Sequence, residues 1–230
     1  MLKYPVMNQS INPDDYVITR KRKLYKFAAF RTLPNCYDES EWQDAKVDVL
    51  NNAHGLTVEV GAGTALFLSK LAAANPDRTY LAIDRKSDRL YKGAKWASEQ
   101  KVNNISYLWS EARNLSTILP AGTVENLWIT FPDPWPQESN IKHRLTNQAF
   151  LAEYHRLLKP GGVLEFKTDN TLLFDWSVEQ FGSKLWRVEH LTHDLHGDDM
   201  ASSDAKIMTT YEARYVSEGK IINYLRAVAK

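Results

Sequence analysis

Short apolar runs alternate with longer segments of mixed polarity over most of the chain, a pattern typical of α/β proteins. Runs rich in β-branched and aromatic residues predict strands at 56–60, 79–83, 105–109, 124–131 and 163–167. Helical spacing of apolar positions predicts helices at 38–53, 65–74, 88–100, 147–158 and 171–181. This order of elements predicts a parallel sheet with helices on both faces.

The C-terminal part departs from this alternation. Residues 186–191 and 209–216 have the composition of strands, and no helix is predicted between them. Such a pair predicts antiparallel strands at one edge of the sheet. We therefore expect a mostly parallel, seven-stranded sheet with an antiparallel edge pair, in a single domain over residues 36–230.

Residues 1–35 have weak periodicity and several prolines, which predicts a separate N-terminal arm. Six Lys or Arg residues and no acid lie from Arg20 to Arg31. A solvated charge run is the commoner outcome for such a segment. The interleaved Tyr25 and Phe27 make contacts with nucleic-acid phosphates a specific hypothesis for this arm.

The composition narrows the class of protein. Hydrophobic residues make up 43% and charged residues 25% of the chain, as in soluble globular proteins. A net charge of +1 gives no bulk sign of a nucleic-acid partner. The single cysteine, Cys36, excludes an internal disulfide and a thiolate metal cluster. No apolar run resembles a signal peptide or a membrane span, so we expect a cytoplasmic protein without membrane contact.

A glycine turn follows strand 56–60. Gly61 and Gly63 permit a tight turn and the close approach of a ligand, such as a dinucleotide or S-adenosylmethionine; a plain turn is the alternative. The dinucleotide pattern needs a small residue three places after Gly63, where Leu66 stands. Glu59 would repel a phosphate but attract the cationic amino-acid end of S-adenosylmethionine.

Acids also follow the next two strands. Asp84 lies 21 residues after Gly63, where it can accept hydrogen bonds from ribose hydroxyls; a helix cap is the alternative. Glu111, followed by Ala112, is placed to contact the amino group of adenine, with a solvated acid as the alternative. Together with Glu59, these acids favour an S-adenosylmethionine site over a plain turn.

Three prolines within residues 131–136 predict a stiff loop at the end of the fourth alternating strand. The loop carries Asp133 and Trp135 at the sheet edge where open α/β proteins bind ligands. Methyl transfer depends on alignment of the acceptor atom with the methyl carbon, which a stiff loop favours. Trp135 can stack on a base or pack under the loop, and its flanking prolines slightly favour packing.

Five strings resemble the bacterial tRNA (guanine-N7-)-methyltransferase family. They are FPDPWP (131–136), HRL (143–145), LLKPGG (157–162), FKTDN (166–170) and TTYE (209–212). The resemblance runs from about Glu59 to Glu212, and FPDPWP is its most specific string. It implies a Rossmann-like class I methyltransferase fold, S-adenosylmethionine as the cofactor and tRNA as the partner.

The resemblance also implies roles for individual residues. Asp133 matches the catalytic acid, which also borders the cofactor. Positions that contact the cofactor match Glu59, Gly61, Gly63, Asp84, Glu111 and Ala112. Positions that bind the substrate guanosine match Asp169, Thr209, Tyr211 and Glu212. The resemblance implies no metal.

Three positions depart from the family pattern. Gln137 replaces the usual Lys after the loop, and residues 138–144 keep only part of the usual basic charge. Both changes affect the expected contact with the substrate. Glu111 replaces an Asp, which is chemically mild.

Guanine N7 has a free lone pair and no proton, so it needs no general base to accept a methyl group. The methylated ring is cationic, and a nearby carboxylate would stabilise the developing charge. Asp133 and Asp169 are candidates for this role, with Glu212 behind them. The His- and Asp-rich segment 193–199 resembles a metal site only weakly, and we expect a mobile loop near the substrate there.

Three other functions stay open from the sequence. The first is methylation of another base, an exocyclic nitrogen or a protein side chain, against which the irregular loop argues. The second is a nucleotide-dependent oxidoreductase, against which Leu66 and Glu59 argue. The third is a non-catalytic RNA-binding protein, which the altered Gln137 keeps open. The sequence leaves open whether the protein is a monomer or a homodimer.

Overall fold

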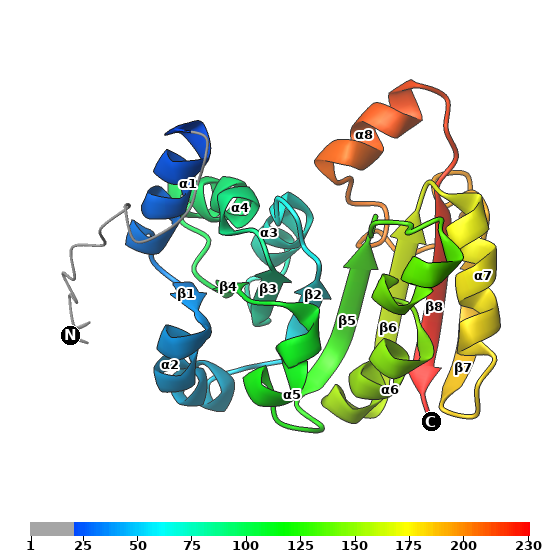
Figure 1. Cartoon of the computed structure of the whole chain (residues 1–230), viewed down its shortest axis with the longest axis horizontal. Coiled ribbons are helices and arrows are strands. Elements are labelled where there is room, and N and C mark those ends of the chain that lie inside the picture. The colour runs from blue at the N-terminus through cyan, green and yellow to red at the C-terminus, as the bar shows by residue number, and fades with distance from the viewer. Residues whose placement is uncertain (1–20) are drawn as a thin grey trace.

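The structure is a computed structural model that describes residues 21–230. This part of the chain forms an eight-stranded sheet of order β1-β4-β3-β2-β5-β6-β8-β7 (Figure 1). The strands are β1 (Cys36–Asp38), β2 (Thr57–Val60), β3 (Tyr80–Asp84), β4 (Ile105–Trp109), β5 (Val124–Thr130), β6 (Leu158–Thr168), β7 (Trp186–Thr192) and β8 (Asn223–Ala229). Strands β1 to β6 are parallel, and β8 lies antiparallel between β6 and β7. The expected mostly parallel sheet with an antiparallel edge pair is confirmed.

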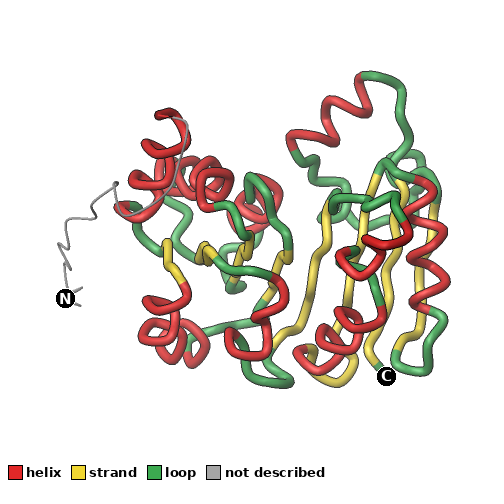
Figure 2. Tube along the Cα trace, viewed as in Figure 1, coloured by secondary structure: helices red, strands yellow, loops and turns green. Residues whose placement is uncertain are grey.

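Helices cover both faces of the sheet (Figure 2). The helices are α1 (Lys21–Thr32), α2 (Glu39–Asn51), α3 (Leu66–Ala74), α4 (Ser87–Glu99), α5 (Leu115–Ile118), α6 (Gln148–Leu157), α7 (Thr171–Phe181) and α8 (Thr210–Ser217), with 3₁₀ turns η2 (Ala112–Asn114) and η3 (Glu138–His143). Helices α2, α5, α6 and α7 contribute to one core, and α1, α3 and α4 to the other.

Alternate residues of each strand enter opposite cores, as the two-residue period of a strand requires. On β3, Leu81 and Ile83 belong to the core with α2, whereas Tyr80 and Ala82 belong to the core with α3. The central strands are therefore apolar on both faces, which explains their continuous hydrophobic runs.

The prediction at the C-terminal edge was wrong for one of its two strands. Residues 209–216 form most of helix α8 instead of a strand, because Thr209 and Glu212 make a capping box. Each of these side chains accepts a hydrogen bond from the backbone N–H of the other. The partner of β7 is instead β8, which pairs with β6 on its other side.

The expected count of seven strands was also wrong, because β1 adds a short eighth strand that pairs parallel to β4. The preceding helix, α1, begins in the segment expected to be an arm. Phe27 and Phe30 of α1 are buried, and the helix packs against α4. Residues 1–20 of the expected arm lie outside the described residues.

Among residues 21–230, no helix is long and apolar enough to cross a membrane. The carboxyl ends of the parallel strands meet at one edge of the sheet, which α8 overhangs (Figure 1). The order of the strands reverses between the neighbours β2 and β5: β3 and β4 follow on one side of β2, and β6 follows β5 on the other side. Open α/β sheets bind ligands at such a topological switch point.

Candidate functional site

A cleft of about 400 Å³ opens at this switch point. Segments that follow four of the parallel strands contribute to its walls. The predicted site residues that line it are Glu59, Gly61, Gly63, Asp84, Glu111, Ala112, Asp133, Thr209 and Tyr211. The structure thus brings together residues that are up to 152 positions apart in the sequence, from Glu59 to Tyr211.

The glycine turn is held in a conformation that suits glycine. Gly61 has φ +72° and Gly63 has φ +54°. A Cβ atom on Gly61 would lie 2.8 Å from Cδ1 of Leu145, so the turn also needs the space of glycine there. The turn is narrow and leaves its backbone open to a ligand in the cleft.

A third glycine that the sequence did not point to supports the same turn. Gly93 lies on α4, and a Cβ there would be 2.7 Å from the carbonyl oxygen of Thr64. Helix α4 therefore approaches the start of α3 closely. Gly93 thus leaves room for the backbone of Thr64 and Ala65, directly after the glycine turn.

Glu59 lies on the floor of the cleft and is fully buried. The Thr130 hydroxyl donates a hydrogen bond to Oε1 of Glu59 at 2.6 Å, whereas Oε2 has no hydrogen-bond partner among the described residues. Burial raises the pKa of Glu59 to about 8, against the opposing effects of Thr130 and Lys167. A buried carboxylate with one unfilled oxygen is suited to a cationic ligand.

Asp84 connects the glycine turn to α4. Its Oδ2 accepts a hydrogen bond from the backbone N–H of Gly63 and its Oδ1 from that of Lys86, both at 2.8 Å. Burial raises the pKa of Asp84, and these two hydrogen bonds oppose the rise. Each oxygen keeps a free lone pair, so the carboxylate can still accept a ribose hydroxyl in the cleft.

Glu111 and Ala112 form the wall beyond β4. Glu111 is half-exposed and makes an ion pair with Arg113. This pair is accessible to solvent and leaves Glu111 able to exchange its partner for a ligand. Ala112 is partly buried against the core and adds an apolar side chain to the cleft wall.

The loop after β5 brings Asp133 and Trp135 to the cleft. Asp133 is exposed, and no hydrogen bond or ion pair reaches its carboxylate from residues 21–230. Trp135 is half-buried, with its ring centroid 5.2 Å from that of His143. The loop thus places a free carboxylate beside an aromatic wall.

The backbone of this loop is unusual. Phe131 has φ +48° and Trp135 has φ +43°, although both carry bulky side chains. Such residues rarely adopt the left-handed region, and functional sites are where this conformation is concentrated.

The four predicted substrate-binding residues have different environments. Thr209 and Tyr211 line the cleft, whereas Asp169 and Glu212 do not. Asp169 accepts a hydrogen bond from Lys220 at 3.2 Å. Glu212 is fully buried, with Lys167 Nζ 2.8 Å from its Oε2 and His196 Nε2 3.0 Å from its Oε1. Contact of Asp169 and Glu212 with a substrate stays a prediction.

Lys167 is a residue of this region that the sequence analysis did not assign. It is fully buried on β6 and also donates to the carbonyl oxygens of Ala205 and Ile207. Burial lowers the pKa of Lys167, and Glu212 opposes that change. A lysine within the apolar strand 163–167 was the available signal, because a buried lysine needs a partner.

The segment 193–199 is anchored by its histidines. His193 Nδ1 lies 2.7 Å from Oδ1 of Asn223, and His196 contacts Glu212. His190, just before the segment, pairs with Asp198 at 2.7 Å. No group of three His, Cys, Asp or Glu residues that could hold a metal occurs in the described part of the chain.

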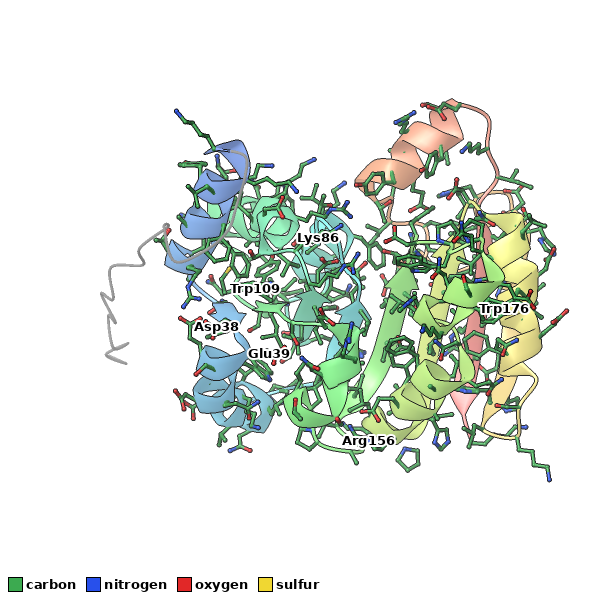
Figure 3. All side chains as sticks on the ribbon, in the orientation of Figure 1. Asp38, Glu39, Lys86, Trp109, Arg156 and Trp176 are labelled. Carbon is green, nitrogen blue, oxygen red and sulfur yellow. The ribbon has the colours of Figure 1, made fainter. Side chains whose placement is uncertain are left out.

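Basic side chains surround the acidic floor of the cleft. Arg85, Lys86, Arg89 and Lys142 line it and have no salt-bridge partner among the described residues. Lys86 lies at the upper edge of the sheet in Figure 3. In the expected arm, Arg31 is paired with Asp38 and Glu41, so that charge is satisfied within the protein.

The donors and acceptors of the cleft fit S-adenosylmethionine. The unfilled Oε2 of Glu59 suits an ammonium group, and the half-used carboxylate of Asp84 suits a ribose diol. The backbone N–H of Gly63, a donor that a pyrophosphate at this turn would need, already donates to the Asp84 carboxylate, which disfavours a dinucleotide.

Comparisons with known proteins agree with this geometry. Residues 53–225 match the Methyltransf_4 family model, whose description is "Putative methyltransferase". The tRNA (guanine-N(7)-)-methyltransferase of Cytophaga hutchinsonii is 37% identical over 78% of this chain and 82% of its own. The enzyme of the same name from Mesomycoplasma hyopneumoniae (strain 7448) is 33% identical over 86% of this chain and 98% of its own.

Solved structures with the same fold include the 16S rRNA methyltransferase KamB, with a TM-score of 0.61 and 17% identity over 84% of this chain and 94% of that chain. The 16S rRNA (adenine(1408)-N(1))-methyltransferase from Catenulisporales acidiphilia has a TM-score of 0.58 and 19% identity, with coverage of 84% and 94%. At this identity, the likeness supports the fold alone.

Proposed function

Because the chain belongs to the bacterial tRNA (guanine-N7-)-methyltransferase family, we propose that it transfers the methyl group of S-adenosylmethionine to N7 of a guanine in tRNA. The observation that carries the proposal is the free Asp133 carboxylate, which shares a cleft with the buried, half-unfilled Glu59. One acid is thus available to the acceptor and the other to the cofactor.

On the cofactor side, S-adenosylmethionine supplies an electrophilic methyl group on a sulfonium. Glu59 would hold its ammonium group, and Asp84 would accept hydrogen bonds from its ribose hydroxyls. Gly61 and Gly63 would let the backbone approach the ligand closely, while Glu111 and Ala112 would border the adenine. These roles are supported by the position of all six residues in the cleft wall.

On the acceptor side, the lone pair of N7 would form the new bond to the methyl carbon while the bond from sulfur to that carbon breaks and its electron pair stays on sulfur. N7 carries no proton, so no residue has to remove one. Asp133 is the catalytic residue: its carboxylate stabilises the positive charge that develops on the guanine ring. The stiff loop fixes the carboxylate before the reaction, which lowers the cost of reorganisation in the transition state. Thr209 and Tyr211 line the same cleft and would contact the base.

Asp169 and Glu212 are proposed to act on the substrate side as well. Asp169 can exchange its exposed partner Lys220 for the guanosine. Glu212 orients Thr209 through the capping box and is held in turn by Lys167. A charge-bearing rim made of Arg85, Lys86, Arg89 and Lys142 suits the phosphates that flank the target nucleotide. The tRNA acceptor also implies a cytoplasmic protein.

The proposal is tested with labelled S-adenosylmethionine and tRNA from a strain without 7-methylguanosine, followed by digestion and identification of the product nucleoside. We expect 7-methylguanosine from the wild type. Asp133→Ala and Asp133→Asn should lower the rate of methyl transfer by about 10²–10³-fold while retaining the affinity for S-adenosylmethionine within a few fold.

Glu138→Gln is a matched control, because Glu138 lies on the exposed turn η3 outside the cleft. A different methylated nucleoside would keep the cofactor but overturn the assigned acceptor. Full activity of folded Asp133→Ala would remove Asp133 from the mechanism. Binding of tRNA without any methylated product would favour a non-catalytic RNA-binding protein.

A further inference from the structure

The loop that carries Asp133 cannot hold itself in place. Pro132, Pro134 and Pro136 lack backbone N–H groups, so the segment has few donors for internal hydrogen bonds. Its left-handed residues, Phe131 and Trp135, are less stable in this conformation than in an extended one. Contacts from elsewhere in the chain must therefore maintain its shape.

Arg144 supplies such contacts from the far side of the turn η3. Its Nε donates a hydrogen bond to the carbonyl oxygen of Pro134 at 3.0 Å. Its Nη2 donates to the carbonyl oxygen of Trp135 at 3.1 Å, and Nε also reaches that oxygen at 3.3 Å. The planar guanidinium thus spans two successive carbonyls directly after Asp133.

The guanidinium is itself held by a rigid platform. Its Cζ lies 4.4 Å from the ring centroid of Trp176, which belongs to α7 and is labelled in Figure 3. Helix α7 packs on β6 through Phe174 and Phe166, whose rings are stacked. Stacking on Trp176 and hydrogen bonding to the loop use different directions of the guanidinium, so both can be satisfied together.

Arg144 does not itself line the cleft, although Lys142, His143 and Leu145 do. The hydrogen bonds of its guanidinium go to carbonyl oxygens of the loop backbone. The next residue, Leu145, is the side chain that lies against the glycine turn at Gly61. The short segment 144–145 therefore connects the acceptor-side loop with the cofactor-side turn.

We propose that Arg144 is a positioning residue that holds the Asp133 loop in its reactive shape through the carbonyls of Pro134 and Trp135, with Trp176 as its platform. The inference rests on the proposed methyl transfer for its kinetic consequence. Its structural consequence, a loop fixed by Arg144, is independent of the acceptor.

The kinetic test compares Arg144→Lys and Arg144→Ala with the wild type. Lysine keeps the positive charge but loses the two-carbonyl geometry and the planar stacking. We expect kcat to fall by about 10- to 100-fold in both variants, because displacement of the catalytic loop disturbs alignment. KM for tRNA and Kd for S-adenosylmethionine should change less than about threefold, since Arg144 touches neither ligand.

Rescue separates this role from a general effect on folding. Guanidinium added below its denaturing range should restore part of the activity of Arg144→Ala, whereas methylammonium should restore less. Arg187→Lys is the matched control, because Arg187 is an exposed residue of the edge strand β7 that pairs with Glu189. It should retain kcat.

Hydrogen exchange tests the loop without any acceptor. The amide of Phe131, whose N–H donates to the carbonyl oxygen of Lys167 at 2.8 Å where the loop begins, should exchange faster in both Arg144 variants than in the wild type, and Trp176→Leu should have the same effect. Unchanged exchange overturns the inference. A rise in KM for tRNA at constant kcat also overturns it, because that result indicates direct contact with substrate. If the wild type makes no 7-methylguanosine while loop exchange follows Arg144, the proposed acceptor fails and the positioning role stands.

Discussion

Glu59→Gln is expected to stabilise the ligand-free protein and to weaken S-adenosylmethionine binding. Glu59 is fully buried, and its pKa of about 8 means that it holds a proton at pH 7 when no cation faces it. Gln keeps the size of the side chain and can still accept the hydrogen bond from Thr130. It removes the ability to become negative beside a cationic ligand.

The sign of the stability effect follows from proton binding. Between about pH 4.5, where an unperturbed Glu titrates, and about pH 8, the native state binds more protons at Glu59 than the unfolded state. Stability from this group therefore falls as pH rises through that window, by about 1.4 kcal/mol per pH unit. Below about pH 4.5, Glu59 has no effect on the free energy of unfolding, and above about pH 8 its full destabilising effect remains. The difference in free energy of unfolding between Glu59→Gln and the wild type should therefore increase by about 2–4 kcal/mol from pH 5 to pH 8, in favour of the variant.

Binding of S-adenosylmethionine should be favoured by higher pH, in contrast to the stability of the ligand-free protein. If S-adenosylmethionine binds to the ionised form, roughly 0.9 proton is released at pH 7, and the affinity rises about ninefold from pH 6 to pH 7. Its ammonium stays largely protonated over this range. Glu59→Gln should bind about 10- to 100-fold more weakly at pH 7, because a charge-assisted hydrogen bond is lost.

Urea unfolding at several pH values measures the stability difference. Calorimetry in buffers of different ionisation enthalpy measures the proton release on binding. Glu165→Gln is an informative control, since burial raises the pKa of Glu165 to about 7 but this residue is not part of the cleft wall. Glu59 is not the titrating group if Glu59→Gln still releases a proton on binding, or if the stability of this variant has the same pH dependence as that of the wild type.

Two further predictions concern the rim and the glycine turn. Arg89→Ala or Lys142→Ala removes one positive charge from the rim and should weaken tRNA binding. The slope of log Kd against log salt concentration should fall by roughly 1, and 7-methylguanosine should still be the product. An unchanged slope would show that these side chains contact no phosphate. Gly93→Ala should destabilise the protein by about 1–3 kcal/mol, because its Cβ would lie 2.7 Å from the carbonyl oxygen of Thr64, and urea unfolding that matches the wild type would contradict this packing.

Much of the fold could be predicted, because in the segment where strands and helices alternate the local sequence pattern favours the same elements as the packing of the sheet. Strands β2 to β5, and β6 from Val163 onward, are mostly apolar runs between helices, and their neighbours bury most of each run. The three-residue strand β1 was missed because it is too short to show a period. Its pairing depends on β4, which lies about 70 residues further along the chain.

The C-terminal error has a different cause. Residues 209–216 combine strand-forming residue types with the Thr-x-x-Glu signature of a helix start, and the cap decided the outcome. Strand β8 follows Gly219 and is buried on both faces, so it has no clear alternation of polar and apolar positions. Its place between β6 and β7 depends on tertiary contacts that no local pattern records.

Most of the cleft wall was predictable because loops after parallel strands converge at one edge of the sheet. The side-chain contacts that hold the wall residues in place from behind were not predictable. Lys167 meets Glu212 across 45 positions of the chain, and Arg144 reaches Trp176 across 32. The sequence shows that such side chains need partners, but the fold chooses which ones.

The carboxylates of this region divide by environment in a way that residue type does not reveal. Glu212 is buried, yet both of its oxygens are occupied: Oε2 by Lys167 and the backbone N–H of Thr209, and Oε1 by the imidazole of His196. Glu59 is equally buried, but one oxygen has no partner among the described residues. Asp133 is exposed and free within the same part of the structure. A carboxylate oxygen at a cleft that has no hydrogen-bond partner in the protein can accept a hydrogen bond from a ligand. A carboxylate whose oxygens all have partners holds the neighbouring residues in place instead. We therefore expect Glu59 and Asp133 to contact the reactants, and Glu212 to act on the reaction through Thr209.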